Sequence, residues 1–232
     1  GDGDLKLNGD GSNYTGDLLI NGGILSVNGT FSGANVTVNQ DAKLGGNGTV
    51  GDTIVDGGTI GAGNSIGHLT INGDLILNSS SALEVEVDNA GHADLVDVTG
   101  VATLGDASVN ILAAAGRYKG KSDYTILTAA GGINGHFGSV TSNFAFLMPT
   151  LAYSTNAVSL TLTRNDVAFA DLGQTANEKA VGNLLQAQGP GNALFEETLL
   201  LADTDVSPDF ASLTGEAWAT LSSATIETSQ ML

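Results

Sequence analysis

The sequence has no cysteine, only three prolines and only seven Lys and Arg residues among its 232 positions. Without cysteine it forms no disulfide framework, thiolate metal site or cysteine nucleophile. This composition suits a chain that crosses an oxidising compartment without forming disulfide bonds. The scarcity of proline excludes a proline-rich linker or a collagen. Twenty-five Asp and Glu residues bring the net charge to −18, which would repel a nucleic-acid backbone and excludes nucleic-acid binding.

Long apolar runs are also missing. The longest, Ile111 to Ala115, is far shorter than the roughly 18 residues of a membrane-spanning helix. The chain starts GDGDLKLNGDG, with neither Met nor a basic signal-peptide region, so we interpret it as a piece of a longer precursor.

Glycine is abundant but unevenly distributed. Residues 1–165 hold 28 of the 33 glycines, whereas residues 166–232 hold five. Each segment has a net charge of −9, so the shorter segment is more acidic per residue. This change of composition predicts a boundary near residue 166.

The first segment shows strand-and-turn patterns that repeat. Similar runs begin at Leu18, Val36, Thr53 and Leu69, at offsets of 18, 17 and 16 residues, and they end at Asn-Gly or Gly-Gly corners. A unit this short buries its apolar face only by stacking on its neighbours. We therefore expect an all-β fold, a right-handed parallel β-helix, with an antiparallel sandwich of Asn-Gly hairpins as the alternative. The residues expected to point inward are Leu18, Ile20, Val36, Val38, Ile54, Leu69 and Ile71.

Residues 1–82 are predicted to form the β-helix coils, and residues 83–165 a C-terminal β cap. Strands lengthen in this second stretch, and half of the chain's twelve aromatic residues fall within 36 positions of it. Large aromatic side chains bury much area, and a solenoid needs a cap to protect its terminal strands. The candidate folding-nucleus residues are Tyr118, Tyr124, Phe137, Phe144, Phe146 and Tyr153.

Residues 166–232 are predicted to form a short α-helical connector. Thr175 and Glu178 fit a capping box, and Gly189-Pro190 ends the helix that follows. Its expected apolar face contains Ala180, Val181, Leu184 and Leu185. Asn192 is expected to cap a second helix that runs through Leu201, and Ser207-Pro208 to begin a third. The third helix is rich in small side chains and contains the candidate pore-helix residues Glu216, Ala217, Trp218, Leu221 and Ala224.

Motifs for catalysis or ligand binding are weak. Gly63-Asn64-Ser65-Ile66-Gly67 matches a nucleophile elbow, but a strand follows it where that elbow needs a helix. The histidines, His68, His92 and His136, are far apart in the sequence. Two acidic groups could supply paired carboxylates for glycoside chemistry, although a solvated strand face is the simpler interpretation: Glu84, Glu86 and Asp88, and Asp94 with Asp97. We predict no catalytic residue, no cofactor and no metal site.

Several segments resemble the passenger of bacterial autotransporters, the type V secretion family. The run GDGDLKLNGDGSNYTGDLLINGGILSVNG is similar to the autotransporter-associated β-strand repeat. YTILTAAGGINGHFGSV and VSLTLTRND resemble the closing strands of the autochaperone, or pertactin-like, junction. LTGEAWATLSSATIETSQML resembles the segment that enters the translocator, with Thr214 and Trp218 in place of the usual Ser and His.

The resemblance implies a non-enzymatic β-helix stem, displayed at the surface of a Gram-negative bacterium or released from it. Its autochaperone region would nucleate passenger folding during outer-membrane secretion and display an adhesin or effector. The implied partners are the protein's own C-terminal β-barrel translocator, which is expected to be missing from these residues, together with outer-membrane assembly machinery and periplasmic chaperones. The resemblance also implies contacts with a host surface or with further copies of the protein. Two alternatives stay open: an adhesive or self-associating surface, and a polysaccharide-degrading β-helix enzyme.

Overall fold

The computed structural model describes residues 3–88, 90–113 and 121–215, which form two compact units. Of the described residues, the first unit contains 3–88, 90–113, 121–142 and 148–163, and the second contains 143–147 and 164–215. Within the described residues, no helix is long and apolar enough to span a membrane.

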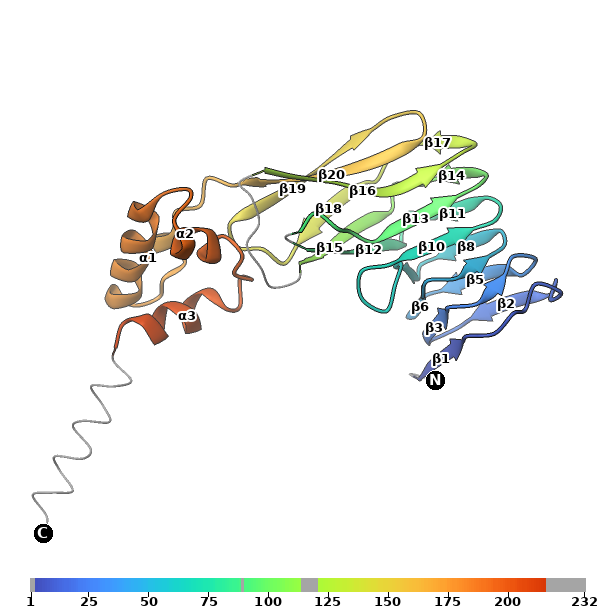
Figure 1. Ribbon diagram of the computed structural model, residues 1–232, viewed down its shortest axis with the longest axis horizontal. Coiled ribbons are helices and arrows are strands. Elements are labelled where there is room, and N and C mark those ends of the chain that lie inside the picture. Colours follow the sequence, from blue (N-terminus) through green and yellow to red (C-terminus); the bar gives the residue numbers. More distant parts are fainter. Residues whose placement is uncertain (1–2, 89, 114–120, 216–232) are drawn as a thin grey trace, which may run out of the picture. The chain divides into compact units, whose positions relative to one another are not determined.

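Three sheets build the first unit, and their strands lie one above another along the stack (Figure 1). Sheet A consists, in spatial order, of β1 (Asp4–Leu7), β3 (Gly23–Val27), β6 (Ala42–Gly45), β9 (Thr59–Ile60), β12 (Ala82–Val87), β15 (Ser108–Ala113) and β18 (Ser139–Ser142). Sheet B consists of β19 (Leu147–Tyr153), β20 (Ala157–Arg164), β16 (Lys121–Ala129), β13 (Leu95–Val98), β10 (His68–Ile71), β7 (Thr49–Val50) and β4 (Thr30–Phe31). Sheet C consists of β17 (Gly132–Asn134), β14 (Val101–Thr103), β11 (Leu75–Leu77), β8 (Thr53–Asp56), β5 (Asn35–Asn39) and β2 (Asp17–Ile20).

The chain visits the sheets in a fixed cycle. It passes from β2 in sheet C to β3 in sheet A and β4 in sheet B, then returns to sheet C at β5. Each of these strands pairs in parallel with the corresponding strand of the next coil. The result is a β-helix-like, all-β architecture, and the parallel pairing excludes the antiparallel sandwich.

The core of the first unit consists of apolar ladders. One ladder in sheet A joins direct strand partners, all of them buried: Leu25, Leu44, Ile60, Leu83 and Val109. Burying such a side chain contributes about 1.5–3 kcal/mol. Alternating positions point inward, so one repeated strand pattern builds the whole ladder.

Of the residues expected to point inward, Ile54 does not. Val36, Val38, Leu69 and Ile71 are buried, but Ile54 is 42% exposed. The β5–β8 register pairs it with Thr37, which lies on the outer face. Val55 fills the interior position instead. The prediction that Ile54 points inward was therefore one residue out of phase with the strand.

The expected repeat length holds for the first coils and then fails. Sheet C partners run from Leu18 to Val36 to Thr53, at the expected offsets of 18 and 17. The next partner of Thr53 is Leu75, 22 residues later, whereas Leu69 lies in sheet B. Residues 61–67 lengthen the corner before β10, and this longer corner accounts for the 22-residue offset from Thr53 to Leu75.

One corner shows why glycine marks the turns. Gly46 has φ +107°, a left-handed backbone conformation that side chains rarely adopt. A Cβ atom there would lie 2.1 Å from the carbonyl oxygen of Val27 in the previous coil. Neighbouring coils can therefore approach this closely only if the corner has no side chain.

The second unit contains a 3-10 helix (Phe169–Leu172), α1 (Ala176–Gln188), α2 (Ala193–Thr198) and α3 (Val206–Leu213). The predicted start of α1 is confirmed, because the Thr175 hydroxyl accepts a hydrogen bond from the Glu178 backbone N–H. Its end is confirmed at Gly189, which has φ +72°. Of the expected packed face, Leu185 is buried and Val181 packs against the same cluster, but Ala180 and Leu184 are exposed, and Gly182 is buried in addition.

The two later helices are shorter or begin earlier than predicted. Asn192 caps α2 through the Leu194 N–H, but the helix ends at Thr198 and not at Leu201. Helix α3 starts at Val206, with Asp205 at the N-cap. Ser207 is therefore inside the helix, where its hydroxyl donates to Glu178 of α1, so a tertiary contact uses the group that was expected to cap α3.

Candidate functional site: the two ends of the coil stack

The C-terminal end of the stack is closed by an antiparallel strand. Strand β20 pairs with β16 from Lys121↔Thr163 to Thr128↔Ala157, with an irregularity between Thr125 and Leu127. Figure 1 shows β20 beside β16, with β19 next to it. The reversal of direction ends the parallel cycle, so β16 has a partner on both sides.

The inner face of β20 is deeply buried. Val158, Leu160 and Leu162 alternate along the strand and are fully buried. Leu160 lies opposite Tyr124 of β16, which is also buried. The Tyr124 hydroxyl donates to the Asp88 carbonyl at 2.8 Å. This bond connects the closing strands to the preceding coil.

The candidate folding-nucleus aromatics do not form one cluster. Tyr124, Phe137 and Tyr153 belong to the first unit, where the Tyr153 hydroxyl accepts a hydrogen bond from the Phe137 backbone N–H at 3.0 Å. Phe144 and Phe146 belong to the second unit. Tyr118 lies outside the described residues. The same holds for all the pore-helix candidates, Glu216, Ala217, Trp218, Leu221 and Ala224.

The second unit has an aromatic core of its own. The Phe146 and Phe169 rings meet edge to face, with centroids 4.7 Å apart, and Phe195 lies 5.1 Å from Phe169. The Arg164 guanidinium lies 5.4 Å from the Phe146 ring centroid and 4.8 Å from that of Phe169. It also donates to the Val167 carbonyl at 2.7 Å. Sequence patterns missed this cluster, because its aromatic residues are spread from 146 to 210.

Glu178 connects two helices of this unit. Its carboxylate accepts hydrogen bonds from the Gln174 backbone N–H at 2.8 Å and from the Ser207 hydroxyl at 2.9 Å. The first of these bonds is the main cause that lowers the pKa of Glu178. The side chain is buried, and it is the glutamate of the predicted capping box.

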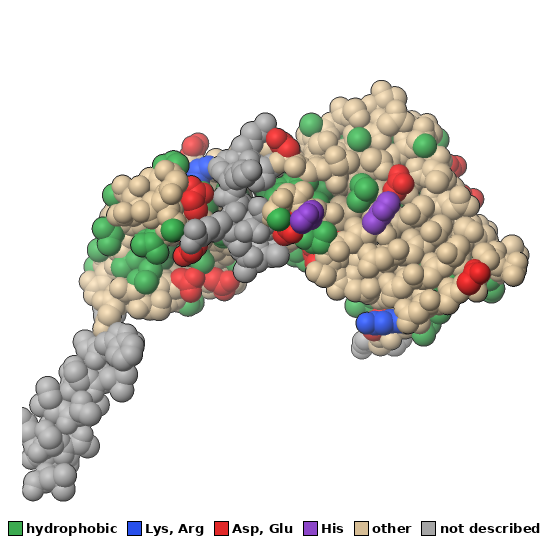
Figure 2. Space-filling model, viewed as in Figure 1, with side chains coloured by type: hydrophobic (Ala, Val, Ile, Leu, Met, Phe, Trp, Pro, Cys, Tyr) green, Lys and Arg blue, Asp and Glu red, His purple; other side chains and the backbone are tan. Residues whose placement is uncertain are grey.

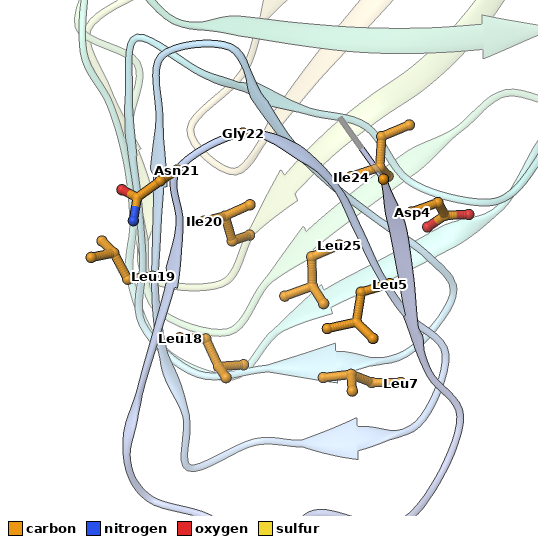
Figure 3. A pocket seen from close by; sticks show the side chains of 11 residues that line it. Asp4, Leu5, Leu7, Leu18, Leu19, Ile20, Asn21, Gly22, Ile24 and Leu25 are labelled. Carbon is orange, nitrogen blue, oxygen red and sulfur yellow. The ribbon is translucent and has the colours of Figure 1, made fainter. Parts of the chain in front are cut away.

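The N-terminal end of the stack presents an open apolar face (Figure 3). A pocket of about 530 Å³ is lined by Leu5 and Leu7 of β1, by Leu18 and Ile20 of β2, and by Leu25 of β3. Leu5 is the first member of the buried sheet A ladder, yet it is 61% exposed. One further in-register strand would bury it as Leu44 is buried.

A polar groove crosses the outer face of sheet A. Gly45 and Gly63 leave space between the walls, and the groove has a volume of about 220 Å³. Lys43 forms an ion pair with Glu84 in the groove, and Asp94 also lines it. Figure 2 shows how few Lys and Arg side chains the described surface has on the drawn face, compared with its carboxylates.

Asp94 is the most perturbed acid of the groove. Only 3% of it is exposed, and burial raises its pKa to about 7. Its two oxygens accept hydrogen bonds from the backbone N–H groups of Gly67 and Glu86, both at 2.8 Å. Sequence reasoning paired Asp94 with Asp97, but Asp97 lies apart from it and accepts a hydrogen bond from Thr128.

Each histidine lies near a carboxylate. His92 Nδ1 is 2.7 Å from Asp88, His136 Nδ1 is 3.0 Å from Asp106, and His68 Nε2 is 3.8 Å from Asp97. In the part of the chain that the structure describes, none of the three is hydrogen-bonded to a serine hydroxyl.

The Asp88 carboxylate is used within its own turn, where Oδ1 accepts hydrogen bonds from the backbone N–H groups of Ala90 and His92. Asp88 therefore does not continue the face of Glu84 and Glu86. The described residues also contain no group of three or more His, Asp or Glu placed to hold a metal ion.

Comparison with known proteins gives relatives but no family model match. The chain is similar to secreted serine proteases. An extracellular serine protease of Serratia marcescens is 33% identical over 196 residues, which are 80% of this chain and 18% of that protein. Another, with the same name and organism, is 29% identical over 184 residues, which are 75% of this chain and 17% of that protein.

The comparison overturns one prediction. We expected that the protein is not an enzyme, and this is wrong, because both relatives are named as proteases. That prediction rested on the weakness of the catalytic motifs within these residues. The sequence itself carries no motif that indicates a protease. The chain spans less than a fifth of the length of the curated relatives that it matches.

Proposed function

We propose that the chain is a passenger segment of an autotransporter-type extracellular serine protease from a Gram-negative bacterium. Its coil stack is a right-handed parallel β-helix that supports the protease and forms during secretion through the outer membrane. The two relatives, both named as extracellular proteases of such a bacterium, support this assignment. The proposed partners are the protein's own outer-membrane translocator, the assembly machinery and periplasmic chaperones.

The closed end of the stack carries the proposal for folding. The closed end has β20 paired with β16 and three fully buried side chains on its inner face. The open end exposes Leu5 and an apolar pocket. We propose that the closed end forms first and acts as an autochaperone, and that each new coil then adds to the exposed face. Each added coil makes backward movement through the membrane more costly.

The test compares two equally buried leucines in the protein expressed from its own gene. Leu160→Asp places a charge at the closed end, and Leu44→Asp places it in the middle of the ladder; both side chains are fully buried. With Leu160→Asp we expect loss of the secreted protein and no protease-resistant fragment. With Leu44→Asp we expect a resistant fragment that begins after β6 and retains the C-terminal coils.

A resistant, secreted Leu160→Asp protein would contradict the nucleation proposal. Equal loss of all fragments in both variants would also contradict it, because the stack would then fold as a single unit without a favoured end. The protease assignment has a separate test. The secreted protein should react with an organophosphorus probe for active serines, and absence of labelling would contradict that assignment alone.

A further inference from the structure

The outer face of sheet C has an apolar column that runs across the coils. Strand register places five outward side chains in line: Leu19, Thr37, Ile54, Ile76 and Thr103. Leu19 is 61% exposed, Ile54 is 42% exposed and Ile76 is 39% exposed. Contiguous exposed apolar side chains with a polar rim are typical of interaction surfaces.

Two polar columns flank this apolar column, and they differ in charge. On the side where the strands begin lie Asp17, Asn35, Asp52 and Asp74. On the side where the strands end lie Asn21, Asn39, Asp56 and Asn78. The first column is mainly carboxylates, and the second is mainly amides.

Hydrogen bonds hold both columns in a regular arrangement. The Asn35 amide donates to Asp17 Oδ1, and the Asp74 backbone N–H donates to Asp52 Oδ1. In the other column the Asn39 amide donates to Asn21 at 2.7 Å. The side chains are therefore preorganised, which lowers the entropic cost of binding a partner. Each of these carboxylates uses Oδ1 in its bond, and each amide has two hydrogens to donate.

We propose that this face binds the same face of a second copy, with the two coil stacks side by side and pointing in the same direction. A two-fold axis parallel to the stack brings apolar column onto apolar column. It also sets the two polar columns opposite each other, so that Asp17 and Asp74 of one copy face Asn21 and Asn78 of the other, while Asp52 faces Asp56. Neighbouring strands repeat every 4.7–4.9 Å or so in any sheet, so the two columns match in spacing along their length.

Charge selects this orientation over its reverse. With the stacks pointing in opposite directions, Asp17, Asp52 and Asp74 would face the same carboxylates of the partner. Like charges in contact disfavour such an arrangement. The net charge of −18 on each copy opposes association in general. Salt screens this repulsion over about 8 Å at 0.15 M, so dimerisation should strengthen between low and physiological salt.

Sedimentation velocity of the purified 232-residue chain at increasing concentration tests the proposal. We expect Ile54→Asp and Ile76→Asp each to weaken dimerisation by about tenfold or more, the loss typical of a central interface residue. Leu112→Asp is the matched control, because Leu112 is 38% exposed but lies on strand β15 of sheet A. The control should dimerise as the unchanged chain does. A chain that stays monomeric at every salt and concentration would overturn the proposal, as would an equal effect of Leu112→Asp.

The orientation is tested separately by cross-linking, which the absence of native cysteine makes clean. Mixing Asp74→Cys chains with Asn78→Cys chains should give disulfide-linked heterodimers, because these two positions face each other across the two-fold axis. Either variant alone should cross-link several-fold less. Preferential linkage of Asp74→Cys to itself would contradict the parallel arrangement.

Discussion

The two ends of the coil stack are built from the same kinds of side chain but present opposite surfaces. At the C-terminal end, β20 runs against β16 and covers Tyr124 with Leu160. At the N-terminal end, Leu5 continues a buried ladder and yet stays exposed. The difference shows that a leucine contributes to the stability of the stack when a neighbouring coil covers it, and not through its residue type alone.

The largest expected effect comes from side chains that are covered on both sides. Leu83 lies between Ile60 and Val109, and Leu83→Ala should lower the free energy of unfolding by about 3 kcal/mol, because it leaves a cavity in the ladder. Leu5→Ala in the same ladder should cost about 0.5 kcal/mol or less. Urea denaturation measures both. Similar costs would mean that the open end is as well packed as the middle.

A smaller effect is expected from the polar contact at the closed end. Tyr124→Phe removes the hydroxyl that donates to the Asp88 carbonyl but keeps the ring. We expect a loss of about 1 kcal/mol, measured by thermal or urea unfolding. Tyr14→Phe is the control, because its hydroxyl donates within an exposed local turn near the open end. Equal losses would show that the closing contact gives no special stabilisation.

The pH dependence distinguishes the middle of the stack from both ends. The pKa of Asp94 is raised to about 7 in the folded chain, against an ordinary value of 3.8. Between these values the folded state holds a proton that the unfolded state has released, so stability falls as the pH rises through this window. Asp94→Asn should remove that part of the slope, as measured by urea midpoints from about pH 4 to about pH 8. An unchanged slope would contradict the raised pKa.

Local patterns predicted much of the fold. The cap of α1 at Thr175 and its end at Gly189 depend on neighbouring residues, so the sequence was sufficient to locate them. The corners and parallel strands likewise follow from Asn-Gly turns and a repeat too short to bury its own face. The first two offsets, 18 and 17, are confirmed by strand register.

The remaining features depend on contacts that a local pattern does not contain. Whether Ile54 or Val55 points inward is decided by the register of β8 against β5. The buried Asp94 accepts hydrogen bonds from Glu86, eight residues before it, and from Gly67, 27 residues before it. The Phe169 cluster joins residues more than 60 positions apart. The relationship to proteases came from comparison with longer proteins and not from a catalytic motif within these residues.

The most direct test of the account is pulsed hydrogen exchange during refolding of the purified chain. If the closed end nucleates folding, amides of β16 and β20 should become protected first. Amides of β11, β8 and β5 should then follow in that order toward the open end. Simultaneous protection of all coils, or earlier protection of β2 and β5 than of β20, would contradict the central claim.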